Sequence, residues 1–479
     1  MAKTIYWYDF ETTGIDPARD RVIQFAGVRT DLELNVIDEP LNLFCYPGDD
    51  VIPAPEAMLV TGLKMTELAE QGEPETRFIE RILAEFSQPG TCVTGFNSVR
   101  FDDEFTRHLL YRNFLDPYAR EWQSGNSRWD VIDFFRMAHA LRPEGFEWPK
   151  NEEGVPTFKL EELSRANGIR HESAHDAVSD VLATIDITRA LKQAQPRLFQ
   201  YLYNLRQKKE VIAQLYPLGK AAVVHVSSMY PAKNSCLAVV LPLCSHPTNT
   251  NGVICYDLSY DPQDLINMGP SKLHGRIFTA QRDLKAGVER IHLKTIHVNR
   301  CPAVAPLPTL EPEMASRIGI DLARCEENMA RLKGASGMVE KITEAFSQAE
   351  FPRTDDPDLM LYQGGFFSDR DRAQMLELRA LDPGALAKAT GAFDDERVEE
   401  MLFRYRARNH PESLSADEQA VWDRYRFDQW RQGGDVETTL ARIDELIDAG
   451  ENPDVLGDLR QYIEGIWASV RQSKKGSLT

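Results

Sequence analysis

The spacing of hydrophobic and polar residues divides the chain into three parts. From residue 1 to about 190, short apolar runs alternate with stretches in which apolar residues recur every three or four positions. Short apolar runs are typical of buried strands, and the wider spacing is typical of amphipathic helices. In residues 76–88 one helical face carries Phe78, Ile82, Leu83 and Phe86. We therefore predict an α/β domain with a mixed sheet and flanking helices.

The elements of this first part follow from the same spacing. The apolar runs predict strands at 5–10, 22–30, 41–46 and 91–95. The helical spacing predicts helices at 75–86, 99–112, 128–141, 159–167 and 175–192.

The pattern changes twice more. Between residues 217 and 308, short β-rich runs are separated by clusters of Pro, Asn and Gly, which predicts a small β-barrel or sandwich. The runs are 223–226, 237–243, 253–258 and 291–298. After Pro308 the helical spacing returns, so the third part is predicted to be helical. Its amphipathic runs are 322–332, 338–346, 398–405, 416–427 and 455–470.

The composition fits a globular protein of several domains. Of the 479 residues, 42% are hydrophobic and 27% are charged, as in soluble proteins. No apolar run reaches the length of a membrane span, and the sequence enters its first strand without the pattern of a secretory signal. Seven scattered cysteines without a Cys-x-x-Cys pair predict reduced thiols in the cytoplasm. They argue against a zinc finger or a disulfide framework.

The net charge of −19 restricts how this chain could bind a nucleic acid. A protein that binds DNA without sequence specificity usually presents a broad basic face. Here a strand would have to be held by local basic patches inside an acidic body. We therefore expect weak binding to bystander duplex and binding of the true substrate in a groove.

Two acidic residues end the first predicted strand. Successive strand side chains point to opposite faces, so Asp9 and Glu11 point the same way. Carboxylates this close repel each other unless a cation lies between them, and a divalent metal ion is the usual cation. An Asp-x-Glu pair is more often solvated surface, but its position after a buried strand makes this pair a candidate metal site. Thr12, Thr13 and Gly14 then turn the chain and leave room for a substrate.

A third acidic residue follows the strand predicted at 91–95. Gly95 permits an unusual backbone angle, and Asn97 suits a cap or a turn before the next helix. Asp102 would then lie at the carboxyl edge of the sheet, where open α/β sheets bind ligands. The alternative is that Asp102 only stabilises the start of its helix electrostatically. The acidic pair in the first strand favours the metal role.

A fourth acidic residue and a histidine open the helix predicted at 175–192. Residues five apart on a helix lie on different faces, so Asp180 can point toward a metal while His175 approaches from one side. This division suits Asp180 as a ligand and His175 as the general base that deprotonates a water molecule. Asp176 is the alternative ligand. A lone histidine is more often structural or on the surface, as we expect for His171.

Together these residues resemble the active site of the DEDD-type 3′→5′ exonucleases, in the subgroup with a histidine five residues before the last aspartate. The matching residues are Asp9, Glu11, Asp102, His175 and Asp180. Four carboxylates without a cysteine suit two Mg²⁺ ions, or Mn²⁺ in their place, rather than zinc. Two ions roughly 4 Å apart would stabilise the attacking and leaving oxygens of an in-line displacement. The implied reaction is hydrolysis of the terminal phosphodiester by water, which releases a 5′-mononucleotide.

The resemblance that covers the whole chain is to the bacterial exodeoxyribonuclease I family. Most other proteins with this site are about one domain long, whereas this chain continues to residue 479. The resemblance rests on Ser127-Arg128-Trp129-Asp130, Ala140-Leu141-Arg142-Pro143-Glu144-Gly145, Gln195-Pro196-Arg197-Leu198-Phe199, Asn299-Arg300-Cys301-Pro302, Gly365-Phe366-Phe367-Ser368-Asp369 and Tyr405-Arg406-Ala407-Arg408-Asn409.

This resemblance implies three domains: an RNase H-like α/β exonuclease domain over 1–192, an SH3-like β-barrel domain over 196–350 and a helical C-terminal domain over 352–474. It implies that they enclose single-stranded DNA in a C-shaped, processive clamp. It also implies binding to the acidic C-terminal tail of single-stranded DNA-binding protein. One departure from the family is Lys159, where the family often has arginine in contact with the substrate. Charge is kept but a bidentate grip on phosphate is lost, so we expect slightly weaker binding there.

The residues that hold the DNA and the partner are predicted with alternatives. Aromatic stacking with backbone cations is the expected grip on a flexible strand, and the candidates are Arg107, Tyr118, Trp122 and Arg136, with Glu11 also beside the substrate. For each of the four, packing or a surface ion pair is the alternative, and Trp129 is expected in the core. By resemblance, Arg142 and Tyr201 bind the partner's tail. Arg206, Lys208 and Lys209 could add to a basic ridge or form only a solvated face.

Three functions are therefore weighed. The leading hypothesis is an exonuclease that degrades single-stranded DNA from its 3′ end in recombination and repair. An RNA-trimming nuclease of the same superfamily is the second, because the site alone does not discriminate the sugar. A non-catalytic scaffold that binds DNA or its binding protein is the third, and the complete set of site residues weighs against it. A monomer is expected by default.

Overall fold

The structure, a computed structural model, describes residues 3–170, 176–348, 353–389, 391–432 and 436–476. The chain packs as two compact units. The first comprises Met1–Ser127, Glu172–Leu182 and Arg353–Thr479, and the second comprises Arg128–His171 and Ala183–Pro352. Segments far apart in the sequence therefore belong to the same unit. The three-domain division at 1–192, 196–350 and 352–474 stays a prediction.

The first sheet has five strands in the order β3-β2-β1-β4-β5. Strand β1 (Thr4–Thr12) pairs antiparallel with β2 (Val22–Thr30) and parallel with β4 (Thr91–Gly95). Strand β3 (Leu41–Phe44) pairs antiparallel with β2, and β5 (Ser127–Asp130) lies at the opposite edge. The sheet is therefore mixed, as predicted.

The helices before residue 128 are α1 (Pro55–Thr61), α2 (Met65–Gln71), α3 (Glu75–Phe86) and α4 (Asp102–Arg112). The bounds of α3, β2 and β4 are those that the sequence predicts. Helices α1 and α2 are not predicted, because seven residues each carry too little periodic pattern.

The helix predicted at 128–141 is wrong over its first residues. Residues 127–130 form strand β5, and α5 begins at Ile132 and ends at Leu141. Pairing at the edge of the sheet is a non-local interaction that overrides the local helical spacing. Trp129 lies on β5 with 3% of its surface exposed, which confirms that it belongs to the core.

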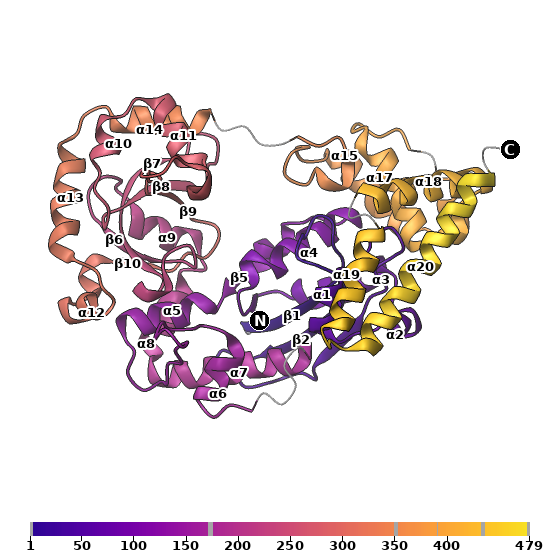
Figure 1. Ribbon diagram of the computed structural model, residues 1–479, viewed down its shortest axis with the longest axis horizontal. Helices are drawn as coiled ribbons and strands as arrows, with labels where there is room; N and C mark the ends of the chain where they lie inside the picture. Colours follow the sequence, from indigo (N-terminus) through magenta and orange to yellow (C-terminus); the bar gives the residue numbers. More distant parts are fainter. Residues whose placement is uncertain (1–2, 171–175, 349–352, 390, 433–435, 477–479) are drawn as a thin grey trace. The chain divides into compact units, whose positions relative to one another are not determined.

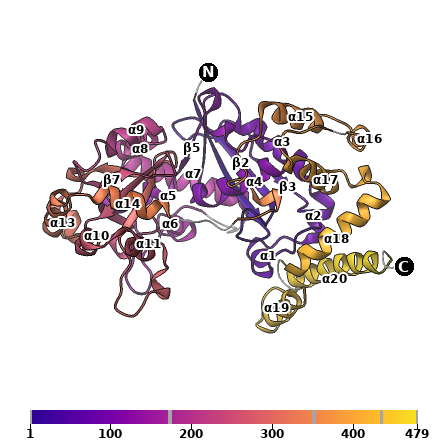
Figure 2. The same cartoon turned by 90° about the horizontal axis from the view of Figure 1, so that it is seen from above.

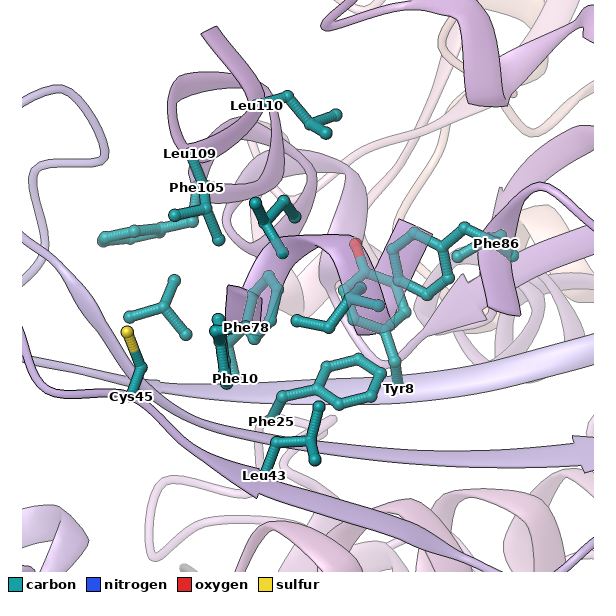
Figure 3. Close-up of a cluster of buried hydrophobic side chains, with 14 of the residues drawn as sticks. Tyr8, Phe10, Phe25, Leu43, Cys45, Phe78, Phe86, Phe105, Leu109 and Leu110 are labelled. Carbon is teal, nitrogen blue, oxygen red and sulfur yellow. The ribbon is translucent and has the colours of Figure 1, made fainter. Parts of the chain in front are cut away.

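A hydrophobic core fills the space between the first sheet and helices α3 and α4 (Figure 3). Tyr8 and Phe10 reach into it from β1. Since alternate residues of a strand face opposite sides, Asp9 and Glu11 face away from this core. The other labelled members are Phe25, Leu43, Cys45, Phe78, Phe86, Phe105, Leu109 and Leu110.

The C-terminal helices of the first unit build two further cores. Helix α20 lies beside α1 in both views of the ribbon (Figures 1 and 2), and a cluster that includes Met58, Leu68 and Leu456 joins them. A second cluster joins Tyr111 and Phe114, near the end of α4, to helices of the 369–409 region. The helices are α15 (Asp369–Arg379), α16 (Pro383–Leu386), α17 (Arg397–Asn409), α18 (Ala416–Gln432), α19 (Val436–Asp448) and α20 (Pro453–Gly476).

The second unit contains an antiparallel sheet in the order β10-β6-β7-β8-β9. Its strands are β6 (Val223–Val226), β7 (Leu237–Ser245), β8 (Gly252–Asp257), β9 (Leu293–His297) and β10 (Val304–Pro306). The β-rich part that the sequence predicts is thus present, with β10 as an additional strand. Among its helices, α14 packs against α11 and β7. The helices are α5, α6 (Leu160–Ala166), α8 (Pro196–Asn204), α9 (Lys208–Leu215), α10 (Gln263–Asn267), α11 (Pro270–Phe278), α12 (Pro312–Arg317), α13 (Leu322–Gly334) and α14 (Met338–Ser347); α7 (Ala177–Ala194) begins in the first unit.

All seven cysteines are free thiols, and six of them are buried. None of the helices in the described ranges combines the length and the apolar character that crossing a membrane requires.

Candidate active site

The end of β1 presents two carboxylates on one side of the first sheet. Asp9 pairs with Ala26 and Glu11 with Gln24 across the β1–β2 ladder, so the backbone holds both residues in register. The ladder shifts register between Glu11 and Thr12, where the chain turns away. Glu11 is 8% exposed and Asp9 is half-buried.

Asp180 joins this pair from helix α7. One carboxylate oxygen each of Asp9, Glu11 and Asp180 lies within 4.8 Å of the others, a spacing that could hold a metal ion. Among the His, Cys, Asp and Glu side chains in the described part of the chain, this is the group of three that lie close enough together to hold a metal ion. The rival ligand Asp176 is exposed, and its side chain accepts a hydrogen bond from the Val178 N–H at the start of α7. The geometry therefore favours Asp180 over Asp176.

Asp102 lies beside this group at the start of α4. Its Oδ1 accepts a hydrogen bond from the backbone N–H of Phe10 at 3.2 Å, which fixes the carboxylate next to β1. Its neighbour Asp103 accepts from the Tyr8 hydroxyl at 2.9 Å and from Arg120 at 2.6 Å. Asp103 thus takes part in a buried structural contact, and Asp102 is the acid turned to the cluster.

The turn between β4 and α4 depends on two residues that the sequence singled out. Gly95 is needed for a close approach rather than for an unusual angle: a Cβ there would lie 2.7 Å from the carbonyl oxygen of Tyr8. Asn97 is the residue with left-handed backbone, at φ 66°. The expectation that Gly95 supplies the unusual backbone angle is therefore corrected.

Burial and mutual repulsion raise the pKa values of these acids. Burial, followed by the neighbouring Asp9 and Asp180, raises the pKa of Glu11 to about 9. Burial and then the Asp180 carboxylate raise the pKa of Asp9, and burial and then Asp9 raise that of Asp102 well above its usual range. Buried carboxylates that repel one another suit a hard divalent cation, which prefers oxygen ligands. The donor set therefore fits a divalent metal.

His175 and His171 lie outside the described residues.

The predicted DNA-binding residues of the first unit lie close together. The guanidinium of Arg107 lies 5.3 Å over the Tyr118 ring and is itself buried between two acids, Glu121 at 2.8 Å and Glu104 at 3.0 Å. Trp122 is 65% exposed. Arg107 therefore packs against the Tyr118 ring, and the Trp122 ring faces solvent.

Two aromatic residues that the sequence analysis did not single out join this group. Tyr362 accepts a hydrogen bond from Arg107 at 3.2 Å and is 54% exposed. Phe366 is 84% exposed, and its ring centroid lies 6.1 Å from that of Tyr118 in an edge-on arrangement. Tyr118, Trp122 and Phe366 line a cavity of about 540 Å³. The signal in the sequence was Gly364-Gly365-Phe366-Phe367, a glycine pair followed by two aromatic residues, of which Phe366 is exposed and Phe367 packs against the core around α17.

The other predicted binding residues lie in the second unit. Lys159 is exposed and 3.7 Å from Glu162, and Arg136 is buried and paired with Asp133 at 2.7 Å. Arg142 is partly exposed and 3.4 Å from the Glu311 carboxylate.

Tyr201, also in the second unit, donates from its hydroxyl to the carbonyl of Val304 at 2.8 Å. Burial raises the pKa of Tyr201 to about 12, so this hydroxyl stays protonated.

Known sequence families cover most of the chain. Residues 6–188 match a family described as Exonuclease, residues 206–348 match the Exonuclease I SH3-like domain and residues 355–466 match the Exonuclease I C-terminal domain. Exodeoxyribonuclease I of Haemophilus influenzae is 42% identical over 464 residues, which are 96% of this chain and 98% of that protein. Exodeoxyribonuclease I of Escherichia coli is 43% identical over 468 residues, 97% of this chain and 98% of that protein.

The chain belongs to the exodeoxyribonuclease I family. Its activity class is therefore that of a 3′→5′ exodeoxyribonuclease, and the predicted fold of exonuclease, SH3-like and helical C-terminal parts is confirmed.

Solved structures of exodeoxyribonuclease I agree. Exonuclease I of Methylocaldum szegediense superposes with a TM-score of 0.93 at 49% identity, covering 97% of this chain and 100% of that one. The zinc-bound form of the Escherichia coli enzyme with single-stranded DNA gives 0.93 at 41% identity with the same coverage. A complex of SSB and exonuclease I with the inhibitor CFAM gives 0.89 at 40% identity, again with that coverage.

Proposed function

We propose that this member of the exodeoxyribonuclease I family hydrolyses single-stranded DNA from its 3′ end at the cluster of Asp9, Glu11 and Asp180, and that it serves DNA repair and recombination. The observation that carries the assignment is the meeting of these three carboxylates, drawn from β1 and α7, within 4.8 Å. Water is the nucleophile, and 5′-mononucleotides are released one after another without dissociation of the strand.

The metal would be Mg²⁺, with Mn²⁺ able to replace it, and the site would hold two ions. Asp9, Glu11 and Asp180 would hold them together with Asp102. Bound there, the ions supply positive charge for the attacking and the leaving oxygen. The chain's own part is to keep the four carboxylates fixed: the β1–β2 ladder holds Asp9 and Glu11, and the Phe10 N–H holds Asp102.

We assign His175 the role of general base, with Glu11 also beside the substrate. An imidazole with an ordinary pKa can take a proton from water near neutral pH. Replacement of His175 by alanine should therefore lower turnover far more than metal affinity. Equal loss of both would reassign the histidine as a metal ligand.

The strand is held by stacking on aromatic rings, of which Trp122, Tyr362 and Phe366 are exposed and Tyr118 is partly buried. We call these four rings the aromatic platform. The platform offers a stacking surface to the bases, and Arg107 contacts Tyr118 and Tyr362 and so holds these two rings in place. Stacking tolerates any sequence, because every base has a flat face. An acidic protein can therefore bind DNA without a broad basic surface. Lys159, which is exposed, and Arg136, which is buried and paired with Asp133, are the other residues assigned to the substrate.

The proposed partner is the acidic C-terminal tail of single-stranded DNA-binding protein. The support is the SSB complex of the related exonuclease I, together with Arg142, a partly exposed cation that could pair with an acidic peptide. Tyr201 is the second residue assigned to this contact. The protein acts as a monomer in the cytoplasm, where its seven thiols stay reduced.

The test uses oligonucleotides labelled at the 5′ end and incubated with Mg²⁺. A ladder that shortens from the 3′ end, stops in EDTA and is blocked by a 3′ cap is the expected result. Shortening from the 5′ end, or activity that survives EDTA, would contradict the proposal. Matched RNA oligomers in the same assay test the alternative of RNA trimming, and faster loss of RNA would favour it. Failure of both substrates to shorten would favour the scaffold.

A further inference from the structure

A chain of buried charged side chains in the first unit runs from helix α17 to the turn that follows Glu11. At the turn, the backbone N–H of Arg21 donates to the Thr13 hydroxyl at 2.9 Å, and the Thr13 N–H donates to the Arg21 carbonyl at 2.8 Å. Arg21 therefore holds Thr13, two residues beyond Glu11, through two hydrogen bonds.

The side chain of Arg21 is held in its turn by a carboxylate that it shares. Arg21 donates to Asp50 Oδ2 at 3.1 Å, and Arg408 of α17 donates to the same oxygen at 2.9 Å. Arg408 also donates to Asp358 Oδ2 at 2.6 Å. These side chains are 7% exposed or less, so water does not compete for the contacts.

These arginines and carboxylates stay charged although they are buried. Burial alone would raise the pKa of Asp50, but Arg408 and Arg21 outweigh it and lower the pKa below its usual range. A buried carboxylate held by two guanidinium groups has little freedom to move. The position of Arg408 is thus transmitted to Arg21.

The turn needs this support because the strand ladder does not reach it. The β1–β2 ladder pairs Glu11 with Gln24 and then, after a shift in register, Thr12 with Val22, so the regular pairing ends directly after Glu11 and the ladder ends before Thr13. Beyond that point Thr13 is held by Arg21 and by the Ala54 N–H, which donates to the Thr13 carbonyl at 2.8 Å.

We propose that Asp50 and Arg408 are positioning residues for the metal site: they fix the turn after β1 and, through it, the direction of the Glu11 carboxylate. The inference rests on the proposed metal-dependent function. It gives the C-terminal helical part a role at the metal centre in addition to any contact with DNA. Outer groups that orient metal ligands typically change metal affinity by 10- to 100-fold when they are lost.

The decisive variant is Asp50→Asn, which keeps the shape of the side chain and removes its charge. We expect Mn²⁺ binding to the full-length protein, measured by electron paramagnetic resonance of free Mn²⁺, to weaken about ten-fold. The Mn²⁺ concentration for half-maximal hydrolysis of a short oligothymidylate should rise by a similar factor. Binding of the same oligonucleotide in EDTA, measured by fluorescence anisotropy, should stay unchanged. Arg408→Lys keeps the charge with a single donor group, so it should weaken Mn²⁺ binding less.

A matched control is available on the same helix. The hydroxyl of Tyr405 lies 2.9 Å from the Thr76 hydroxyl, so Tyr405→Phe also loses a buried polar contact between α17 and the nuclease part. That contact involves neither Arg21 nor Asp50. Tyr405→Phe should therefore lower the melting temperature without weakening Mn²⁺ binding.

The outcomes separate the inference from the function on which it rests. Weaker Mn²⁺ binding in Asp50→Asn but not in Tyr405→Phe supports the positioning role. Mn²⁺ binding by Asp50→Asn equal to that of the wild type overturns it, even where the melting temperature falls. If the wild type itself bound no Mn²⁺, the proposed metal-dependent function would fail, and the inference with it.

Discussion

The first unit buries two sets of carboxylates that differ in their neighbours. Glu11 and Asp102 are 8% and 4% exposed, and Glu75 and Asp50 are 5% and 6% exposed. Burial alone would raise all four pKa values. The neighbours of Glu11 and Asp102 are other acids, and their pKa values rise further. Arginines lie beside Glu75 and Asp50, and the pKa values of these two acids fall.

At equal burial, the charges of the neighbouring side chains therefore distinguish a functional acid from a structural one. Protein cations already balance the charge of Glu75, which accepts from Arg112 at 2.8 Å and from Asn113 at 3.0 Å. Asp9, Glu11 and Asp180 instead bring three carboxylates within 4.8 Å of one another, an arrangement that a divalent metal ion would suit. Perturbed acids of this kind are typical of active sites.

The largest expected effect comes from Asp180→Asn. Loss of one carboxylate from the cluster should lower the rate of single-stranded DNA hydrolysis at least about a thousand-fold. The melting temperature of the metal-free protein should stay level or rise, because one repulsive charge is removed. The control is Asp176→Asn, directly before the same helix, which should keep most of the activity. An equal loss in both variants would make Asp176 the ligand. The measurements are hydrolysis of a labelled oligonucleotide and a thermal melt in EDTA.

Glu75→Gln should show the opposite behaviour. Its removal leaves the buried guanidinium of Arg112 without its ion-pair partner, so we expect about 3 kcal/mol less free energy of unfolding. Glu75 Oε1 also lies 3.9 Å from Nε of Arg21, so the metal affinity of the folded protein should fall far less than in Asp180→Asn. The exposed Glu70→Gln on α2 is the control and should stay within about 0.5 kcal/mol of the wild type. Urea unfolding measures both, and a Glu75→Gln protein as stable as Glu70→Gln would break the comparison.

The pH dependence of stability should separate the two sets. Glu11 has a pKa raised from 4.5 to about 9, so the metal-free folded state holds a proton that the unfolded chain has lost. Stability from this group is complete below about pH 4.5 and is lost as the pH rises toward 9. Glu75 and Asp50 have lowered pKa values, so their contribution is lost as the pH falls below the usual range of carboxyls.

Added Mg²⁺ should therefore act on one side of this profile only. Melting temperatures measured from about pH 3 to 9 should show stabilisation by Mg²⁺ that grows as the pH rises, because the metal binds the deprotonated acids. The loss at acid pH should be the same with and without Mg²⁺. Stabilisation that does not change with pH would contradict the assignment of the raised pKa values to the metal site.

The smallest expected effect concerns the aromatic platform, which should be separable from both sets of acids. Phe366→Ala should weaken binding of an oligothymidylate in EDTA by about 1–3 kcal/mol, as loss of one stacking partner does. Stability should change little because the side chain is 84% exposed. Val421→Ala, an exposed apolar residue of α18, is the control. Equal affinity of Phe366→Ala and Val421→Ala for the oligonucleotide would remove Phe366 from the platform.

The sequence predicted that Asp9, Glu11 and Asp180 meet, because each acid has a strong local context. Asp9 and Glu11 end a continuous apolar strand, and Asp180 opens a long helix, so the elements could be placed without knowing the fold. Gly95 was noticed for the wrong reason: its φ is ordinary, and the close approach to the Tyr8 carbonyl is a contact between neighbouring strands that local pattern does not show.

The sequence could not predict the arginine–carboxylate chain. Arg21, Asp50, Asp358 and Arg408 lie up to several hundred residues apart, and each stands in a segment whose composition is typical of a solvated surface. Only the packing of α17 against the nuclease part brings them together and buries them. Arg107 shows the same limit, since the sequence does not reveal that two glutamates enclose it.

The first unit is built from segments that the ribosome synthesises at different times. Residues 353–476 are translated long after the strand that carries Asp9 and Glu11, yet they belong to the same compact body. A ribosome-bound chain thus carries its acids for most of translation without the helix that contacts Asp50. At about 5–20 residues per second, the C-terminal helices emerge tens of seconds after that strand, so the contact between Arg408 and Asp50 forms last and a truncated product lacks it.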